Sequence, residues 1–142
     1  MTNAGTTDMV PVTIVGVAVA SRESPHDHQD RRERFSIVLA PAAGGDPRRL
    51  SIGVGDAEAA TLAFSLQGQE FPRPMTYQLM ASLVAAAGSA VRSVRVTGQA
   101  DGVFYAQVTL RGGAVVDARP SDAINLAAIT GAPVLVAAEL LS

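Results

Sequence analysis

The sequence contains no cysteine and no lysine, and only two histidines among its 142 residues. The missing cysteines exclude disulfides, thiolate catalysis and cysteine-bound zinc or iron–sulfur centres. The missing lysines exclude a Walker A phosphate loop and a Schiff-base mechanism. Both histidines, His26 and His28, lie in one polar segment, which we interpret as a solvated loop rather than a metal site. A Ser-His-Asp triad centred on Ser121 is therefore not expected.

Charged residues and long apolar runs are also scarce. Charged residues make up 17% of the sequence and the net charge is −2, so nucleic-acid binding would have to rest on a local arginine patch. Each apolar run is shorter than the roughly 18 residues of a membrane span. Residues 1–8 show no signal-peptide pattern. We therefore expect a cytoplasmic protein with no membrane partner.

The pattern of apolar residues and turn residues predicts one α+β domain. Strands are predicted at 10–20, 35–40, 49–54, 91–97, 103–110, 114–117 and 133–137, and the first of them is expected to be buried. Helices are predicted at 56–66, at 77–87 with Thr76 as its cap, and at 120–130. The tight turns between residues 91 and 117 indicate a three-strand antiparallel meander. We expect a disordered tail at 1–8 and a single compact domain at 9–142, with a mixed sheet and three helices.

The densest polar cluster is the turn from Asp117 to Asp122, where a strand ends and a helix begins. One interpretation is functional: Asp117 and Asp122 hold Mg²⁺ or Mn²⁺, and Arg119 binds a phosphate, as metal-assisted phosphodiester cleavage requires. The other is structural. In that case Pro120 opens the helix, Ser121 and Asp122 cap it, and Arg119 pairs with Asp117 or with a backbone carbonyl. The residues alone favour the structural interpretation.

Three other residues are candidates for the same site. Glu58, in the first turn of its helix, matches Asp122 in a weak internal repeat that pairs the two helices. Arg73, held between two prolines, is either a second phosphate ligand or a surface arginine. Tyr105 is either a core aromatic or a ring on which a nucleic-acid base stacks.

The run from Val116 to Ile124, VDARPSDAI, resembles the bifunctional nuclease domain, a small domain of bacteria and plants. The segments RPMT at 73–76 and DGVFYA at 101–106 precede it in matching order, and the Glu58-Ala59 helix start and GAP at 131–133 also match. The resemblance covers roughly residues 10–141. It implies a compact α+β domain that degrades both DNA and RNA.

The resemblance also implies where the functional residues lie. The positions that match the family's motifs are Asp117, Arg119, Ser121, Asp122, Glu58 and Arg73. One departure stands out: after Arg-Pro-x-Thr the family usually has His-Asp, whereas this sequence has Tyr77 and Gln78. If the family's pair serves as an acid–base group or metal ligand, this chain lacks it.

Two functional hypotheses follow, besides the structural interpretation of the turn. The first is a nuclease that acts on DNA and RNA with a divalent metal, Mg²⁺ or Mn²⁺, and no organic cofactor. Its catalytic residues would be Asp117, Asp122, Ser121 and Glu58, its metal ligands Asp117 and Asp122, and its substrate-binding residues Arg119, Arg73 and Tyr105. The second is a non-catalytic binding or regulatory module, favoured by the missing His-Asp pair and the acidic net charge. In either case we expect a homo-oligomer, most simply a dimer.

Overall fold

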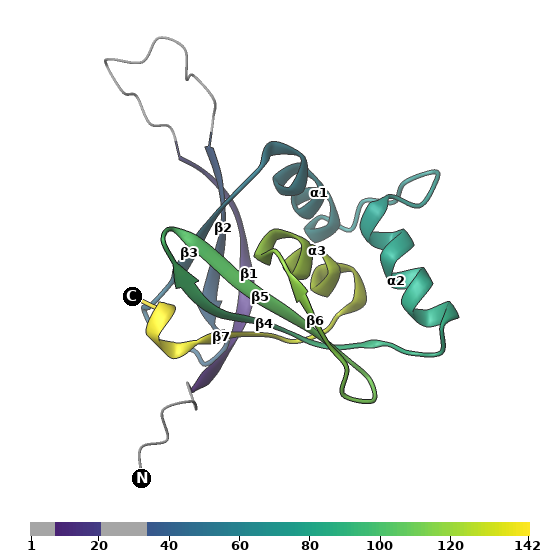
Figure 1. Cartoon of the computed structure of the whole chain (residues 1–142). Helices are drawn as coiled ribbons and strands as arrows, with labels where there is room; N and C mark the ends of the chain where they lie inside the picture. The colour runs from purple at the N-terminus through teal and green to yellow at the C-terminus, as the bar shows by residue number, and fades with distance from the viewer. Residues whose placement is uncertain (1–7, 21–33) are drawn as a thin grey trace.

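The computed structural model describes residues 8–20 and 34–142. Its strands are β1 (Met9–Ala20), β2 (Arg34–Pro41), β3 (Leu50–Val54), β4 (Val91–Ala100), β5 (Val103–Leu110), β6 (Val115–Ala118) and β7 (Val134–Ala137). Its helices are α1 (Asp56–Leu66), α2 (Thr76–Ala86) and α3 (Pro120–Thr130), and a 3₁₀ turn at Ala138–Leu140 follows β7 (Figure 1). The tail predicted at 1–8, except Asp8, and the segment with His26 and His28 lie outside the described residues.

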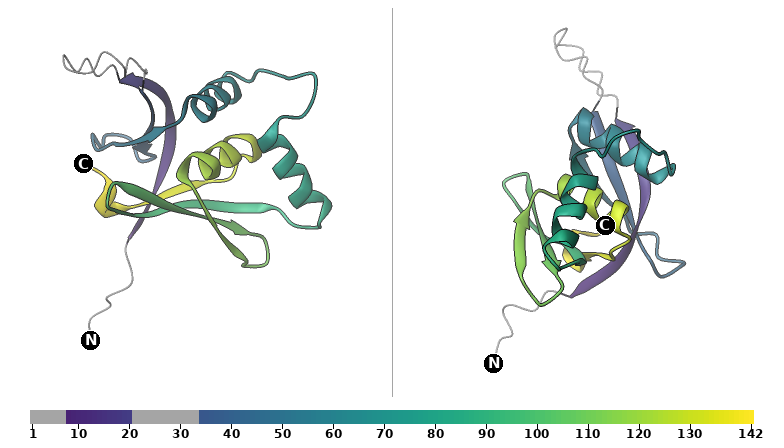
Figure 2. Two further views of the ribbon diagram at one scale, coloured as in Figure 1. Left: turned by 45° about the horizontal axis from the view of Figure 1, so that its top comes forward. Right: turned by 90° about the vertical axis from the view of Figure 1, so that its right-hand side faces the viewer.

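The strands form one seven-stranded sheet in the order β3-β2-β1-β7-β4-β5-β6. Every neighbouring pair is antiparallel except β4 and β7, which run parallel. The sheet curls around α3, and all three helices lie on its concave side (Figures 1 and 2). The predicted α+β fold with a mixed sheet and three helices is thereby confirmed, and so is the meander β4-β5-β6.

Helix α3 is the centre of the core. It packs against β4 and β5 on one side and against α1 and α2 on the other. Because it is covered nearly all round, its residues from Ala123 to Ala127 are all buried, which explains why the sequence here is apolar without a polar face. Gly131 ends the helix in the left-handed conformation, with φ 75°, as its position in the sequence predicts.

Two local predictions need correction. The first strand, predicted to be buried, is buried on one face only, because Val15 and Val19 on its other face are 60% and 57% exposed. Thr76 was predicted to cap α2, but it is the first helical residue and the cap position belongs to Met75. The backbone N–H of Met75 donates to the side-chain carbonyl of Gln78, so Gln78 stabilises the helix start in place of Thr76.

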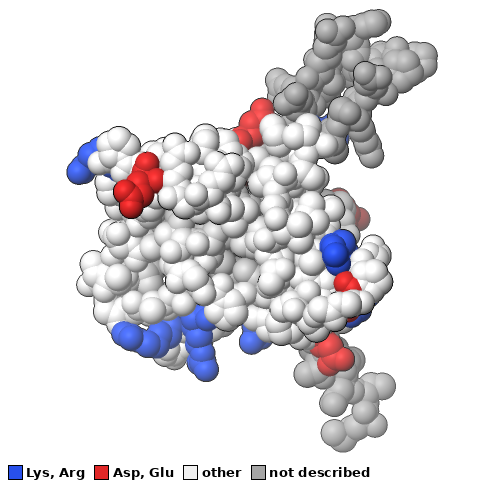
Figure 3. Space-filling view, turned by 180° about the vertical axis from the view of Figure 1, so that it is seen from behind, with Lys and Arg blue, Asp and Glu red and all other residues white. Residues whose placement is uncertain are grey.

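Charged side chains are thinly spread over the surface seen from behind in Figure 3. Within residues 8–20 and 34–142, no helix combines the length and apolar character needed to cross a membrane.

A candidate active site where three helices begin

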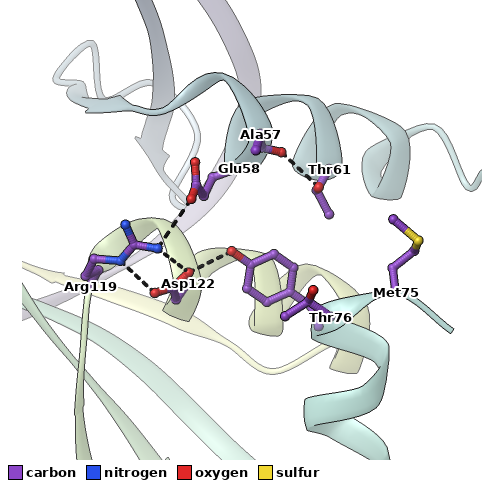
Figure 4. Close-up of a pocket in the computed structure, with 8 residues that line it drawn as sticks. Ala57, Glu58, Thr61, Met75, Thr76, Arg119 and Asp122 are labelled. Atoms are coloured by element: carbon purple, nitrogen blue, oxygen red, sulfur yellow. Dashed lines mark hydrogen bonds and ion pairs between the residues drawn. The ribbon is translucent and has the colours of Figure 1, made fainter.

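A pocket of about 230 Å³ opens where the first turns of α1, α2 and α3 meet (Figure 4). Glu58 and Asp122 are the third residues of α1 and α3, and Tyr77 is the second residue of α2. The first N–H groups of a helix lack partners inside the helix, so three helix starts together favour a negatively charged ligand. The pocket is lined by Ala57, Glu58, Thr61, Met75, Thr76, Tyr77, Arg119 and Asp122.

Arg119 joins the two carboxylates of the pocket. Its Nε donates to Asp122 Oδ2 at 2.8 Å, and its Nη2 donates to Asp122 Oδ1 at 3.0 Å and to Glu58 Oε1 at 3.3 Å. On the far side of Asp122, the Tyr77 hydroxyl donates to Oδ1 at 2.7 Å. The Arg119 side chain is 66% exposed, so it is able to turn toward a ligand without disturbing the core.

The same contacts set the protonation states. Burial raises the pKa of Tyr77 above its usual range, and the hydrogen bond to Asp122 raises it further. Burial also acts to raise the pKa of Asp122, but the hydrogen bonds from Arg119 and Tyr77 outweigh it, so this pKa lies below its ordinary value. At neutral pH Asp122 is therefore ionised, while Tyr77 keeps its proton and acts as a donor.

Asn125, a residue that sequence reasoning missed, holds two of these helices together. It is completely buried, and its Nδ2 donates to the backbone carbonyls of Ser121 at 2.9 Å and of Glu58 at 3.2 Å. Its Oδ1 has no hydrogen-bond partner among the described residues. The amide thereby fixes the first turn of α1, which carries Glu58, against α3.

Replacing Asn125 by alanine is expected to lower the free energy of unfolding by about 1–3 kcal/mol, because the buried amide that joins the Glu58 carbonyl to α3 is lost and leaves a cavity. Thermal unfolding checks this, with a fall in Tm of about 2–4 °C for each kcal/mol. Ser82→Ala, on the exposed side of α2, is the control and should change the free energy by less than about 0.5 kcal/mol. An unchanged Tm for Asn125→Ala would show that the amide does not tie the helices together.

The structure does not bring Asp117 and Asp122 together. Asp117 in β6 pairs with Gln107, whereas the next residue, Ala118, pairs with Ala106, which is fully buried. Since side chains alternate along a strand, Ala118 shares the helix-facing side of the sheet and Asp117 lies on the opposite, outer side. The predicted metal pair of Asp117 and Asp122 is therefore not formed.

The other predicted residues lie as follows. Ser121 is buried, and α3 has no side-chain cap, so the predicted capping by Ser121 and Asp122 is wrong. Pro120 does occupy the first helical position, as predicted. Arg73 is exposed in the connector between α1 and α2 and does not line the pocket. Tyr105 is 48% exposed and therefore not a core aromatic.

The side chains of the pocket give a limited fit for a metal ion. In the part of the chain that the structure describes, no group of three or more histidine and acidic side chains is placed to hold a metal ion. Glu58 and Asp122 do face the same pocket, and Mg²⁺ is often bound by one or two carboxylates, with water and phosphate as the remaining ligands. Because Arg119 contacts both carboxylates, they fit a divalent cation only when its guanidinium turns away.

The chain belongs to the bifunctional nuclease domain family, which matches residues 37–142. An uncharacterized protein of Mycobacterium tuberculosis is 36% identical over 134 residues, covering 94% of this chain and 75% of the relative. Bifunctional nuclease 1 of Oryza sativa subsp. japonica is 30% identical over 114 residues, covering 76% of this chain and 34% of the relative. The family resemblance inferred from the motifs is thereby confirmed.

Membership gives the departure at Tyr77 a structural meaning. The resemblance implies histidine at the position of Tyr77, whose hydroxyl is a hydrogen-bond donor to Asp122. A donor next to this carboxylate is thus present despite the substitution. Gln78, where the resemblance implies aspartate, accepts the N–H of Met75 and has a structural role at the start of α2.

Proposed function

We propose that this protein is a nuclease that binds a phosphodiester at the pocket between the three helix starts and hydrolyses it. The observation that carries the proposal is the convergence of Glu58, Arg119 and Asp122 at one pocket. These residues come from the first turns of two helices that are far apart in the sequence. Membership in the bifunctional nuclease domain family supports a nuclease, and DNA and RNA are the substrates that the resemblance implies.

Arg119 is the phosphate ligand in this mechanism. Its guanidinium would leave the two carboxylates and bind the phosphate through two parallel hydrogen bonds, a geometry that lysine cannot provide. Asp122, released from Arg119 but still bound to Tyr77, would then accept the proton of a water whose oxygen bonds to phosphorus. The P–O bond to the leaving oxygen breaks, and that oxygen takes up a proton from solvent. Mg²⁺ or Mn²⁺, if held by Glu58 and Asp122, would neutralise phosphate charge and acidify bound water.

The test is a cleavage assay on single-stranded DNA and RNA with Mg²⁺, with Mn²⁺ and with a chelator. Cleavage by the wild type that the chelator abolishes supports a metal-assisted nuclease. Cleavage that persists in the chelator would remove the metal from the proposal while retaining the hydrolase. No cleavage under any condition would overturn the proposal.

A non-catalytic binding module is the alternative, and one observation favours it. Both pocket carboxylates are already engaged by Arg119, and Asp122 also by Tyr77, so neither is a free base in this conformation. The alternative predicts saturable binding of an oligonucleotide without turnover, even with Mn²⁺ present.

We also propose that the protein forms a dimer through α2. This helix has no charged residue, and its Met75, Leu79 and Leu83 form a stripe with exposed fractions of 46%, 52% and 61%. The helix packs mainly against α3, so the stripe has no cover among the described residues. An apolar stripe without charge repulsion is suited to pairing with its own symmetry mate.

Leu83→Glu is expected to convert the dimer into a monomer, because pairing would bury two new carboxylates without partners. Light scattering coupled to gel filtration measures the mass directly. Leu66→Glu is the matched control, since Leu66 is an exposed leucine of α1, 43% accessible, and its change should leave the dimer intact. A wild type that is monomeric throughout a concentration series would contradict the dimer.

A further inference from the structure

We propose that the outer side of β4 and β5, the sheet face turned away from the helices, binds single-stranded nucleic acid at a second site separate from the pocket. The surface, here named the outer arginine face, consists of Arg92, Arg95, Tyr105 and Gln107, with Arg111 at its edge, where the Arg111 guanidinium contacts the turn after α2. Binding at this surface rests on the proposed function only because nucleic acid is taken as the ligand, and it does not require that the protein cleaves nucleic acid.

The strand register turns two arginines outward. In β4 the buried Val94 pairs with Val108, and the next residue, Arg95, pairs with Gln107, so Arg95 and Gln107 share the outer side. A register shift between Val91 and Ser93 inserts Arg92 as the extra residue of a bulge. Val91 and Val94 both pack toward the core, which leaves Arg92 exposed to solvent with Arg95.

Arg111 brings a third guanidinium to the same end of β4. Its backbone N–H donates to the carbonyl of Ala90 at 2.8 Å, and its Nη2 donates to the carbonyl of Gly88 at 2.7 Å. These two contacts fix Arg111 next to the start of the strand that carries Arg92. In Figure 3, arginine side chains project together from the lower edge of the molecule.

Within residues 8–20 and 34–142, these arginines have no acidic partner. Among the described residues, ion pairs are formed by Arg48 with Asp46 and by Arg119 with Glu58 and Asp122, and none involves Arg92, Arg95 or Arg111. Their charge is therefore available to a ligand. This is the local arginine patch that the chain, with its net charge of −2, needs in order to attract a polyanion.

Tyr105 adds an aromatic ring beside the arginines. It is 48% exposed, and its cross-strand partner is Gly98, which has no side chain to cover the ring. Gln107 lies two residues after Tyr105 in β5 and is paired with Arg95 of β4. Tyr105 and Arg95 are therefore diagonal neighbours on the same side of the sheet. A ring beside a row of cations is the combination that binds single strands, whose unpaired bases stack while their phosphates meet arginine.

Asp117 sets the limit of the surface. It lies on the same outer side in β6, opposite Gln107, and its carboxylate would repel a phosphate. The nucleic acid therefore follows β4 and β5 rather than crossing β6. For this reason the charge at Asp117 should weaken binding, and Asp117→Asn should strengthen it.

The test measures anisotropy of a fluorescein-labelled oligonucleotide, as DNA and as RNA, in chelator and over a series of salt concentrations. The double variant Arg92→Gln/Arg95→Gln is compared with Arg48→Gln/Arg49→Gln, which removes the same charge from the loop before β3. The first double variant is expected to bind at least about tenfold more weakly. The plot of log affinity against log salt concentration should become shallower by about 1.4, because each of the two lost phosphate contacts contributes about 0.7 to its slope. The second should bind like the wild type.

Variants of Tyr105 provide a second test of the proposed binding surface. Tyr105→Ala is expected to weaken binding about tenfold through loss of stacking, whereas Tyr105→Phe, which keeps the ring, should bind like the wild type. A duplex of the same sequence should bind more weakly than the single strand. Equal binding by the two arginine double variants, an unchanged affinity in Tyr105→Ala, or duplex binding as tight as single-strand binding would each overturn the proposal.

These experiments test the nuclease pocket and the outer arginine face independently. Weakened binding in Arg92→Gln/Arg95→Gln, with no cleavage by the wild type, would retain the outer arginine face and remove the nuclease. Cleavage by the wild type, with binding unaffected in that variant, would retain the nuclease and remove the outer arginine face. Thermal unfolding of each variant confirms that the fold survives.

Discussion

Asp122→Asn is expected to lower the rate of phosphodiester cleavage by about 100-fold or more, the usual contribution of a positioned acid–base group. Asparagine keeps the size of the side chain and an acceptor for the Tyr77 hydroxyl. It loses the negative charge, and with it the capacity to accept a proton from water. Rates of DNA and RNA cleavage measured on identically purified proteins check the prediction, and a variant as active as the wild type would contradict it.

Stability separates a catalytic effect from a folding effect. The pair of Asp122 with the exposed Arg119 is worth at most about 1 kcal/mol, so the variant should fold. Because the folded-state pKa of Asp122 is depressed, this contribution is present above its unfolded-state pKa and is lost as the pH falls through the folded-state value. The difference in Tm between wild type and variant should therefore be seen at neutral pH and disappear in acid.

Two matched variants complete the comparison with Asp122→Asn. Asp101→Asn changes a turn residue with φ 52°, a conformation that asparagine tolerates, and should leave cleavage unchanged. Asp117→Asn tests whether Asp117 is catalytic, as the sequence predicts, or lies outside the active site, as the structure indicates. Loss of cleavage there would return Asp117 to the catalytic set, whereas full activity would agree with its place on the outer side of the sheet.

Arg119→Gln is expected to lower cleavage by about 100-fold and, at the same time, to tighten the binding of Mn²⁺. Cleavage falls because the two-hydrogen-bond phosphate contact is worth several kcal/mol in a transition state that carries extra charge. Mn²⁺ binding tightens because Glu58 and Asp122 lose the cation that joins them and become a pair of uncompensated carboxylates.

Calorimetric titration with Mn²⁺ measures the second effect without any nuclease activity. Arg48→Gln, which breaks an ion pair outside the pocket, is the control and should leave the Mn²⁺ affinity as it is. If Arg119→Gln binds Mn²⁺ no better than the wild type, the two carboxylates do not form a cation site. In that case a divalent metal held by Glu58 and Asp122 would no longer be part of the proposed mechanism.

The secondary structure could be predicted from the sequence because its signals are local. Runs of β-branched residues mark the strands, and Gly68, Gly88 and Gly131 follow the three helices, each with a positive φ. The strand order could not be predicted. The parallel pairing of β4 with β7 joins segments on either side of β5, β6 and α3, and no local pattern records such a contact.

The candidate site was predicted in part for the same reason. The helix-start pattern and the internal repeat singled out Glu58, Arg119 and Asp122, which the structure brings to one pocket. Asp117 was misplaced because the Val-Val-Asp-Ala strand has no polar alternation to indicate which side faces the core. The sequence does not predict the role of Tyr77, because its hydrogen bond to Asp122 joins residues 45 positions apart in the chain.

The attachment of α2 has a consequence for what the pocket admits. Glu58 and Asp122 stand on helices that pack against the sheet, but Tyr77, Thr76 and Met75 stand on α2, which rests mainly on α3 (Figures 2 and 4). One wall of the pocket is therefore held chiefly by the contact of α2 with α3, while the opposite walls are also backed by the sheet. Widening this aperture would break the hydrogen bond between the Tyr77 hydroxyl and Asp122, so the width of the pocket and the freedom of the Asp122 carboxylate change together.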